Sequence, residues 1–146
     1  METSICRLSG CAALKVAKRL KKYEIVYVST SPVVAKKLEN QNRTYIVGEC
    51  NRRSGLRILR VLRRCMAVAW TEKPDVVVSA GAAPGLVMCA AAKLMGAKIG
   101  WIDSIANIER LSMSGRIVRP VADLFLTQWD ELAAKYANVE YAGNLL

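Results

Sequence analysis

Short apolar segments and amphipathic segments alternate along the chain. Runs rich in β-branched and apolar residues, each too short for a stable helix, predict strands over 4–8, 24–29, 44–47, 76–78, 98–102 and 123–127. Helical spacing of apolar residues predicts helices over 12–22, 32–39, 55–71, 86–95, 114–119 and 130–136. Strands that alternate with helices predict an α/β fold, a Rossmann-like parallel sheet with helices on both faces.

The segment 74–85 contains a junction that α/β proteins often use for binding. A buried strand over 76–78 leads into the small residues Gly81, Ala82 and Ala83, and Pro84 suits the first turn of the next helix. Ligands of such folds lie outside the carboxyl ends of the strands, and a helix N-terminus favours anionic or polar groups. The segment predicts a ligand-binding turn, or alternatively a tight turn that binds nothing.

Length and composition are those of one folded domain spanning 1–146. The chain has 146 residues, of which 53% are hydrophobic, so we expect a well-formed core. The first twenty residues carry charges where a signal peptide would be apolar, and 76–92, although uncharged, is interrupted by Gly and Pro. We therefore expect neither a signal peptide nor a transmembrane helix.

Several classes of chemistry are excluded or disfavoured by residue types. The chain contains no histidine, which excludes a Ser-His-Asp or Cys-His arrangement within it. Its five cysteines lack any Cys-x-x-Cys pair, so we expect reduced, mostly buried thiols and no metal site. A phosphate-binding Gly-x-x-x-x-Gly-Lys loop and a Gly-x-Gly-x-x-Gly motif are both missing. We expect no cofactor.

Positive charge is concentrated in the first half. Residues 1–74 contain sixteen Lys or Arg against five Asp or Glu, a balance of +11, whereas 75–146 contain six against seven, a balance of −1. This asymmetry indicates an anionic partner, either nucleic acid or an acidic membrane.

The helix expected over 55–71 carries much of this charge. Arg57, Arg60 and Arg64 form one stripe, which Arg53 would extend. Opposite them lie Ile58, Leu59, Leu62, Met66 and Ala69, and Val61 and Val68 are expected to flank the arginines. Apolar surface beside cationic surface is typical of helices at a bilayer interface, although an ordinary solvated face would have the same composition.

Polar side chains follow the strand expected over 98–102. Asp103 and Ser104 come directly after it, with Glu109, Arg110, Ser112 and Ser114 close behind. Asp103 is a candidate base toward a sugar hydroxyl, or a group that holds one by hydrogen bonds. It could equally cap the following turn.

Four blocks, in order, resemble a known family. They read Ser79-Ala80-Gly81-Ala82-Ala83-Pro84, Trp101-Ile102-Asp103-Ser104-Ile105-Ala106-Asn107, Leu111-Ser112-Met113-Ser114-Gly115-Arg116 and Ala122-Asp123-Leu124-Phe125-Leu126-Thr127-Gln128-Trp129. The chain from about residue 23 to its end is thereby similar to the asparagine-linked glycosylation protein fourteen family of oligosaccharide biosynthesis, whose members look like the N-terminal half of a GT-B glycosyltransferase.

The resemblance implies a subunit that is inactive alone. It would bind a polyprenyl-pyrophosphate-linked saccharide as acceptor and recruit a soluble subunit, the C-terminal GT-B half, which binds a UDP-sugar such as UDP-N-acetylglucosamine. It would lie at the cytoplasmic face of a membrane as a peripheral protein, attached to the anionic surface by Arg53, Arg57, Arg60 and Arg64. Asp103 is then the candidate catalytic residue. The candidate substrate-binding residues are Ser9, Gly10, Cys11, Gly81, Ala82, Ala83, Ser104, Asn107, Glu109 and Ser114.

The chain departs from the family pattern at two positions. Where the family has a Gly-Gly-His turn, this chain reads Ser9-Gly10-Cys11, and a thiol is a poor replacement for a histidine base. Asn107 stands where an arginine is common. Proton removal would therefore fall to Asp103 or to the partner.

Two other functions fit the composition. A basic module could anchor a partner at the membrane without touching substrate. A nucleic-acid-binding protein would also account for the net charge of +10, but no recognition motif and no aromatic residues on the arginine stripe support it, so we expect no nucleic acid.

Overall fold

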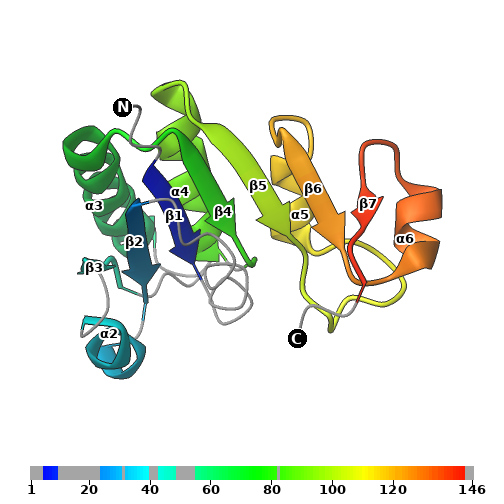
Figure 1. Cartoon of the computed structure of the whole chain (residues 1–146), viewed down its shortest axis with the longest axis horizontal. Helices are drawn as coiled ribbons and strands as arrows, with labels where there is room; N and C mark the ends of the chain where they lie inside the picture. Colours follow the sequence, from blue (N-terminus) through cyan, green and yellow to red (C-terminus); the bar gives the residue numbers. More distant parts are fainter. Residues whose placement is uncertain are drawn as a thin grey trace.

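The computed structural model describes residues 5–9, 24–30, 32–39, 43–48, 55–81 and 83–143 (Figure 1). Its strands are β1 (Ile5–Ser9), β2 (Glu24–Ser29), β3 (Thr44–Ile46), β4 (Val76–Ser79), β5 (Lys98–Ile102), β6 (Leu124–Thr127) and β7 (Glu140–Tyr141). Its helices are α2 (Pro32–Glu39), α3 (Gly55–Glu72), α4 (Ala83–Leu94), α5 (Met113–Val118) and α6 (Asp130–Lys135). The helix predicted over 12–22 lies outside the described residues.

All seven strands form one parallel sheet. Their order is β3-β2-β1-β4-β5-β6-β7, and every neighbouring pair is parallel. This confirms the predicted α/β class. The helix after β4 begins at Ala83, three residues before the predicted start, because Pro84 is accommodated in its first turn. Strand β7 was not predicted, since two residues give no periodicity.

The strand order reverses between β1 and β4, which are neighbours in the sheet. Their last residues, Ser9 and Ser79, are paired, and Ser79 is paired in turn with Trp101 of β5. The carboxyl ends of the three strands therefore meet at one edge. In open α/β sheets this reversal is the place where ligands bind.

Helices cover the sheet in two layers. Helix α3 packs against α4, and α4 against α5, and in Figure 1 α4 and α5 lie behind the sheet. Because crossovers between parallel strands are right-handed, α2, which joins β2 to β3 in the opposite direction along the sheet, belongs to the other face. Between the sheet and the α3–α5 layer lies a core whose largest buried side chains include Trp101, Met88 and Ile99.

The orientation of α3 differs from the prediction. Its buried side chains are Val61, Cys65, Val68, Ala69 and Glu72. Placing Val61 and Val68 at the border of the arginine stripe was therefore wrong: they pack into the core, while Leu59 is 55% exposed. Small and β-branched side chains let the helix approach the sheet closely, and the longer leucines remain outside.

Two cysteines of the core are described as free and buried. Cys65 lies on α3 and Cys89 on α4. Burial raises the pKa of the Cys89 thiol to about 12, although a hydrogen bond with Ser79 lowers it in part. The predicted reduced, buried state is confirmed for these two thiols; Cys11 and Cys50 lie outside the described residues.

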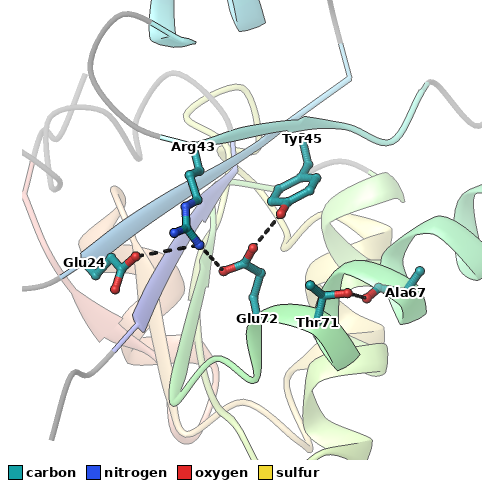
Figure 2. A network of polar contacts seen from close by, with 6 residues as sticks. All are labelled: Glu24, Arg43, Tyr45, Ala67, Thr71 and Glu72. Atoms are coloured by element: carbon teal, nitrogen blue, oxygen red, sulfur yellow. Dashed lines mark hydrogen bonds and ion pairs between the residues drawn. The ribbon is translucent and has the colours of Figure 1, made fainter.

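Glu72, the last residue of α3, has a buried carboxylate that connects this helix to β3, the strand at the edge of the sheet (Figure 2). The Tyr45 hydroxyl donates a hydrogen bond to Glu72 Oε1 at 2.5 Å, and Arg43 lies 3.8 Å from Glu72 Oε2. The same guanidinium lies 4.0 Å from Glu24, which begins β2. Because a buried charge is costly unless it is paired, these contacts let Glu72 remain inside and fix α3 against β3.

Replacing Tyr45 with Phe should destabilise the fold. The change leaves a buried carboxylate without its hydroxyl donor, so the free energy of unfolding should fall by about 1–3 kcal/mol in urea titrations. The matched control is Thr71→Ala, which removes the hydroxyl of an exposed Thr71 whose hydrogen bond to the Ala67 carbonyl stays within α3. Equal losses in the two variants would contradict the role given to Glu72.

Candidate functional site

The turn after β4 has the geometry that its small residues predicted. Gly81 has a φ of +95°, in the region that favours glycine, and its carbonyl accepts a hydrogen bond from the Ser79 hydroxyl at 3.4 Å. A Cβ placed on Gly81 would lie 4.0 Å from the Ile102 carbonyl oxygen, so the turn lies against the end of β5. Helix α4 starts two residues later at Ala83, with its free N–H groups at this edge.

A loop over 103–112 follows β5 and is closed by one side chain. Asp103, only 2% exposed, accepts hydrogen bonds at Oδ2 from the Ser112 N–H (2.9 Å) and at Oδ1 from the Ser112 hydroxyl (2.5 Å). The Trp101 indole N–H lies 3.4 Å from the same Oδ1. The carboxylate therefore holds the two ends of the loop together.

The same contact positions α5. Ser112 is the N-cap of this helix, and its hydroxyl oxygen accepts a hydrogen bond from the Gly115 N–H at 2.8 Å. Gly115 is closely surrounded, because an added Cβ would lie 2.9 Å from Ser112 Oγ, 3.0 Å from Asp103 Oδ1 and 3.1 Å from Phe125 Cζ. We call Asp103, Ser112 and Gly115 the carboxylate clamp.

Three side chains of the β6–α6 segment donate hydrogen bonds to backbone carbonyls of the loop over 103–112. Gln128 Nε2 donates to the Asp103 carbonyl at 3.3 Å, and Trp129 Nε1 donates to the Ile105 carbonyl at 2.9 Å. Lys135 Nζ reaches the Glu109 carbonyl at 3.4 Å. In a helix or strand, these carbonyl groups would accept hydrogen bonds from other backbone N–H groups; in this loop, side chains donate to them instead. The three hydrogen bonds therefore stabilise the conformation of the loop.

A pocket of about 300 Å³ opens within this loop, lined by Ala106, Asn107, Ile108, Glu109 and Arg110. Ser104 holds the start of the pocket-lining segment, since its hydroxyl accepts from the Ala106 N–H at 3.3 Å and its carbonyl accepts from the Asn107 N–H at 3.1 Å. An amide, a carboxylate and a guanidinium are the groups that bind sugar hydroxyls and phosphates.

The structure brings together most of the predicted substrate-binding residues that it describes. Asp103, Ser104, Asn107 and Glu109 share the loop, and Ser114 follows in α5. Gly81 and Ala83 lie at the adjacent strand end, beside Ser9 of β1. Gly10, Cys11, Ala82 and Arg53 lie outside the described residues. Arg57, Arg60 and Arg64 are exposed on α3, a different element.

Sequence reasoning named Arg110 and Ser112 among the polar residues after the strand, but it missed the other side chains that support the loop. Arg110 lines the pocket, and the supporting side chains are Ser112, Gln128, Trp129 and Lys135. Only Ser112 carries a local signal, as a serine directly before a helix. The others act across 24 to 26 positions in the chain, a separation that no local pattern reports.

The surroundings of Asp103 bear on its chemistry. A general base must reach the proton that it removes, either directly or through one water. Both carboxylate oxygens of Asp103 are engaged by Ser112, and the residue is buried. These contacts show a positioning role between β5 and the start of α5. They do not show the predicted cap of the following turn, where the Ala106 N–H donates to the Ser104 hydroxyl instead. The role as a base stays a prediction.

Known proteins resemble this chain in sequence. The model of the family described as "Oligosaccharide biosynthesis protein Alg14 like" matches residues 13–145. The UDP-N-acetylglucosamine transferase subunit ALG14 of Yarrowia lipolytica is 35% identical over 115 residues, which is 75% of this chain and 53% of that protein. The corresponding alg14 subunit of Schizosaccharomyces pombe is 40% identical over 75 residues, which is 48% of this chain and 36% of that protein. The chain thus spans about half the length of these relatives or less.

Solved structures share the fold. MurG of Acinetobacter baumannii superposes with a TM-score of 0.76 at 16% identity, covering 94% of this chain and 45% of that one. UDP-N-acetylglucosamine 2-epimerase of Rickettsia bellii superposes with a TM-score of 0.72 at 15% identity, covering 97% of this chain and 45% of the epimerase chain. At such identity the likeness establishes the fold alone, and it confirms the predicted GT-B half.

Replacing Gly115 with Ala should disrupt the carboxylate clamp. The new methyl group would crowd Ser112 and Asp103, so the free energy of unfolding should fall by about 1–3 kcal/mol. Gly55 offers the matched control because a Cβ there meets nothing within 4 Å, and Ala in a helix is favoured over Gly by up to about 1 kcal/mol. Urea titrations in which Gly115→Ala proves as stable as Gly55→Ala would contradict the clamp geometry.

Proposed function

Because the chain belongs to the Alg14-like family of oligosaccharide biosynthesis proteins, we propose that it is the acceptor-binding half of a two-component glycosyltransferase. A second, soluble subunit with the C-terminal GT-B half would bind the UDP-sugar, and transfer would occur between the two. The relatives are named UDP-N-acetylglucosamine transferase subunits, and we therefore propose UDP-N-acetylglucosamine as the donor.

One observation carries the proposal. The pocket and the loop that contains it follow β5 at the carboxyl edge of the sheet, the edge at which ligands of α/β folds bind. The sequence relatives are named transferase subunits, which supports an acceptor site here and a donor site on a second subunit.

The acceptor would be a polyprenyl-pyrophosphate-linked saccharide. Asn107, Glu109 and Ser104 offer hydrogen bonds to sugar hydroxyls, and Arg110 offers a positive charge for phosphate. The small residues at Gly81 and Ala83 allow a ligand to approach the N-terminal end of α4, where backbone N–H groups favour anionic or polar groups.

In the proposed reaction, an acceptor hydroxyl oxygen attacks C1 of the donor sugar. The bond from C1 to the UDP oxygen breaks, UDP departs with its electron pair, and the hydroxyl proton passes to a general base. Asp103 remains the local candidate for that base only if the clamp opens toward substrate. With the clamp closed, the partner supplies the base and Asp103 is a positioning residue that holds the loop and the start of α5.

The protein would work at the cytoplasmic face of a membrane as a peripheral protein. The positive charges of Arg53, Arg57, Arg60 and Arg64 complement anionic lipid, and each such residue contributes about 1 kcal/mol near the surface. Among the described residues, no helix has both the length and the apolar character needed to cross a bilayer.

Deleting the gene and restoring it tests the function. In membranes from the deletion strain, transfer of N-acetylglucosamine from the UDP-sugar to extracted lipid-linked saccharide should fall to background and return with the wild-type chain. Ser104→Ala together with Asn107→Ala should fail to restore it, since Asn107 lines the pocket and the Ser104 hydroxyl bonds the backbone of Ala106, which also lines it. Undiminished transfer after deletion would contradict the proposal, and full rescue by the double variant would favour a protein that only anchors its partner.

Trp129→Phe should weaken acceptor binding selectively. The change keeps an aromatic ring but removes the N–H donor to the Ile105 carbonyl, so the loop loses one of its supports. In assays of the complete two-subunit enzyme, the KM for the lipid acceptor should rise by roughly tenfold while the KM for the UDP-sugar stays unchanged. A fall in kcat alone, with both KM values constant, would indicate only a loss of folded protein.

A further inference from the structure

The outer side of α3 exposes large apolar side chains among its arginines. Leu56 is 83% exposed, Leu59 55% and Trp70 68%, although a surface helix normally places polar residues there. Arg60 and Arg63 are exposed on the same helix. The rotation of α3 that buries Val61 and Cys65 turns these leucines and Trp70 away from the core.

The neighbouring helices share this character. Exposed or half-exposed positions of α4 include Val87, Ala90 and Leu94, the last of them 80% exposed, and Lys93 is the only charged residue of the helix. Met113 and Ile117, four residues apart, are 47% and 57% exposed on α5, and Val121 continues the spacing.

The charges of these three helices have one sign at the surface. They carry Arg57, Arg60, Arg63, Arg64, Lys93 and Arg116, against a single carboxylate, Glu72. Glu72 is buried and hydrogen-bonded to Tyr45, and Lys93 Nζ lies 2.8 Å from Asp123 Oδ2, which balances its charge. The net positive charge on the exposed side of these helices therefore comes from the arginines of α3 and from Arg116 of α5. A surface that is both apolar and cationic is complementary to an anionic lipid headgroup layer above acyl chains.

We propose that the outer side of the α3–α5 layer, defined by Leu56, Leu59, Trp70, Leu94, Met113 and Ile117, is the surface that enters the interface of an anionic membrane. The inference rests on the proposed membrane association and specifies how it occurs. The three helices pack side by side, α3 on α4 and α4 on α5, so their exposed apolar side chains belong to one layer. In this proposal the arginines of α3 contact the lipid headgroups, and apolar side chains of all three helices insert into the interface.

The direction of the helices places this surface beside the acceptor site. Each of the three helices leads into the next strand of a parallel sheet, so its N-terminal end lies at the carboxyl edge of the strands. Leu56 and Met113 are the first apolar residues of α3 and α5, and both therefore lie at the edge that holds the loop over 103–112. A lipid-linked acceptor would then reach the loop directly from the membrane.

Vesicle binding tests the inference without any substrate. The full chain is mixed with vesicles of phosphatidylglycerol and phosphatidylcholine in equal parts, or of phosphatidylcholine alone, and bound protein is measured by cosedimentation. Leu94→Gln and Ile117→Gln should each weaken binding to the anionic vesicles about tenfold, and Arg60→Gln and Arg63→Gln about fivefold each. Trp70 fluorescence should shift to shorter wavelength on binding, whereas Trp101 is already fully buried.

Matched controls come from α2, on the other face of the sheet. Val33 is 67% exposed and Lys36 is also exposed, so Val33→Gln and Lys36→Gln change similar groups and should leave binding intact. Equal weakening by the two sets, or binding with no shift of the Trp70 emission, would overturn the proposal. So would equally strong binding to phosphatidylcholine alone.

Other occupants of this surface give different results. If a second copy of the chain covers it, analytical ultracentrifugation should show a dimer that Leu94→Gln dissociates, and anionic vesicles should not compete with dimerisation; this result would overturn the proposal. If the partner subunit covers it, adding that subunit should displace the chain from vesicles, which would overturn the proposal as well. Because the vesicles contain neither donor nor saccharide acceptor, failure of the transfer assay leaves these results unaffected.

Discussion

A parallel sheet must be covered on both faces, and this constraint organises the rest of the molecule. Strands β1 and β4 to β6 cannot be left open to water, so each connection between parallel strands includes a crossover across one face. The crossovers return every strand in the same direction, which collects the loops that follow the strands at one edge. The turn at Gly81 and the loop beginning at Asp103 are neighbours because β4 and β5 are neighbours.

The need to cover the sheet explains why the helices α3 to α5 are apolar on the side that faces the sheet, but not why their outer side is apolar as well. Val61, Cys65 and Met88 face the sheet and form its cover. The apolar side chains on the outer side, such as Trp70 and Leu94, are exposed and do not take part in that cover. We propose that they contact a membrane, in which case one layer of helices both covers the core and brings the proposed acceptor site to the lipid.

The sequence predicted what depends on local patterns and missed what depends on contacts between distant residues. The runs over 24–29 and 98–102 were predicted correctly because β-branched, apolar residues of that length suit only strands. The rotation of α3 was predicted wrongly because periodicity shows that a helix has an apolar side but not which part of a wide apolar side is buried. Here Glu72, bonded to Tyr45 from another element, helps to fix the choice.

Asp103 shows the same limit within the site. Its position after a strand made it a candidate site residue, but its partners, Ser112 and Trp101, and the support of its carbonyl by Gln128 depend on the fold. A carboxylate after a strand has the same sequence signature whether it meets substrate or closes a loop. Glu109 and Arg110 were named as polar residues after the same strand, and Asn107 came from the family resemblance; the structure places all three around one pocket.

The claim that this chain is one half of a transferase is tested most directly by mixing purified components. The chain, bound to vesicles that contain the lipid-linked acceptor, is combined with a purified soluble C-terminal GT-B half and radiolabelled UDP-N-acetylglucosamine. Label should enter the lipid only when both proteins are present, with a rate that saturates at an equimolar ratio. Transfer by the soluble half alone, at the same rate and to the same acceptor, would contradict the account.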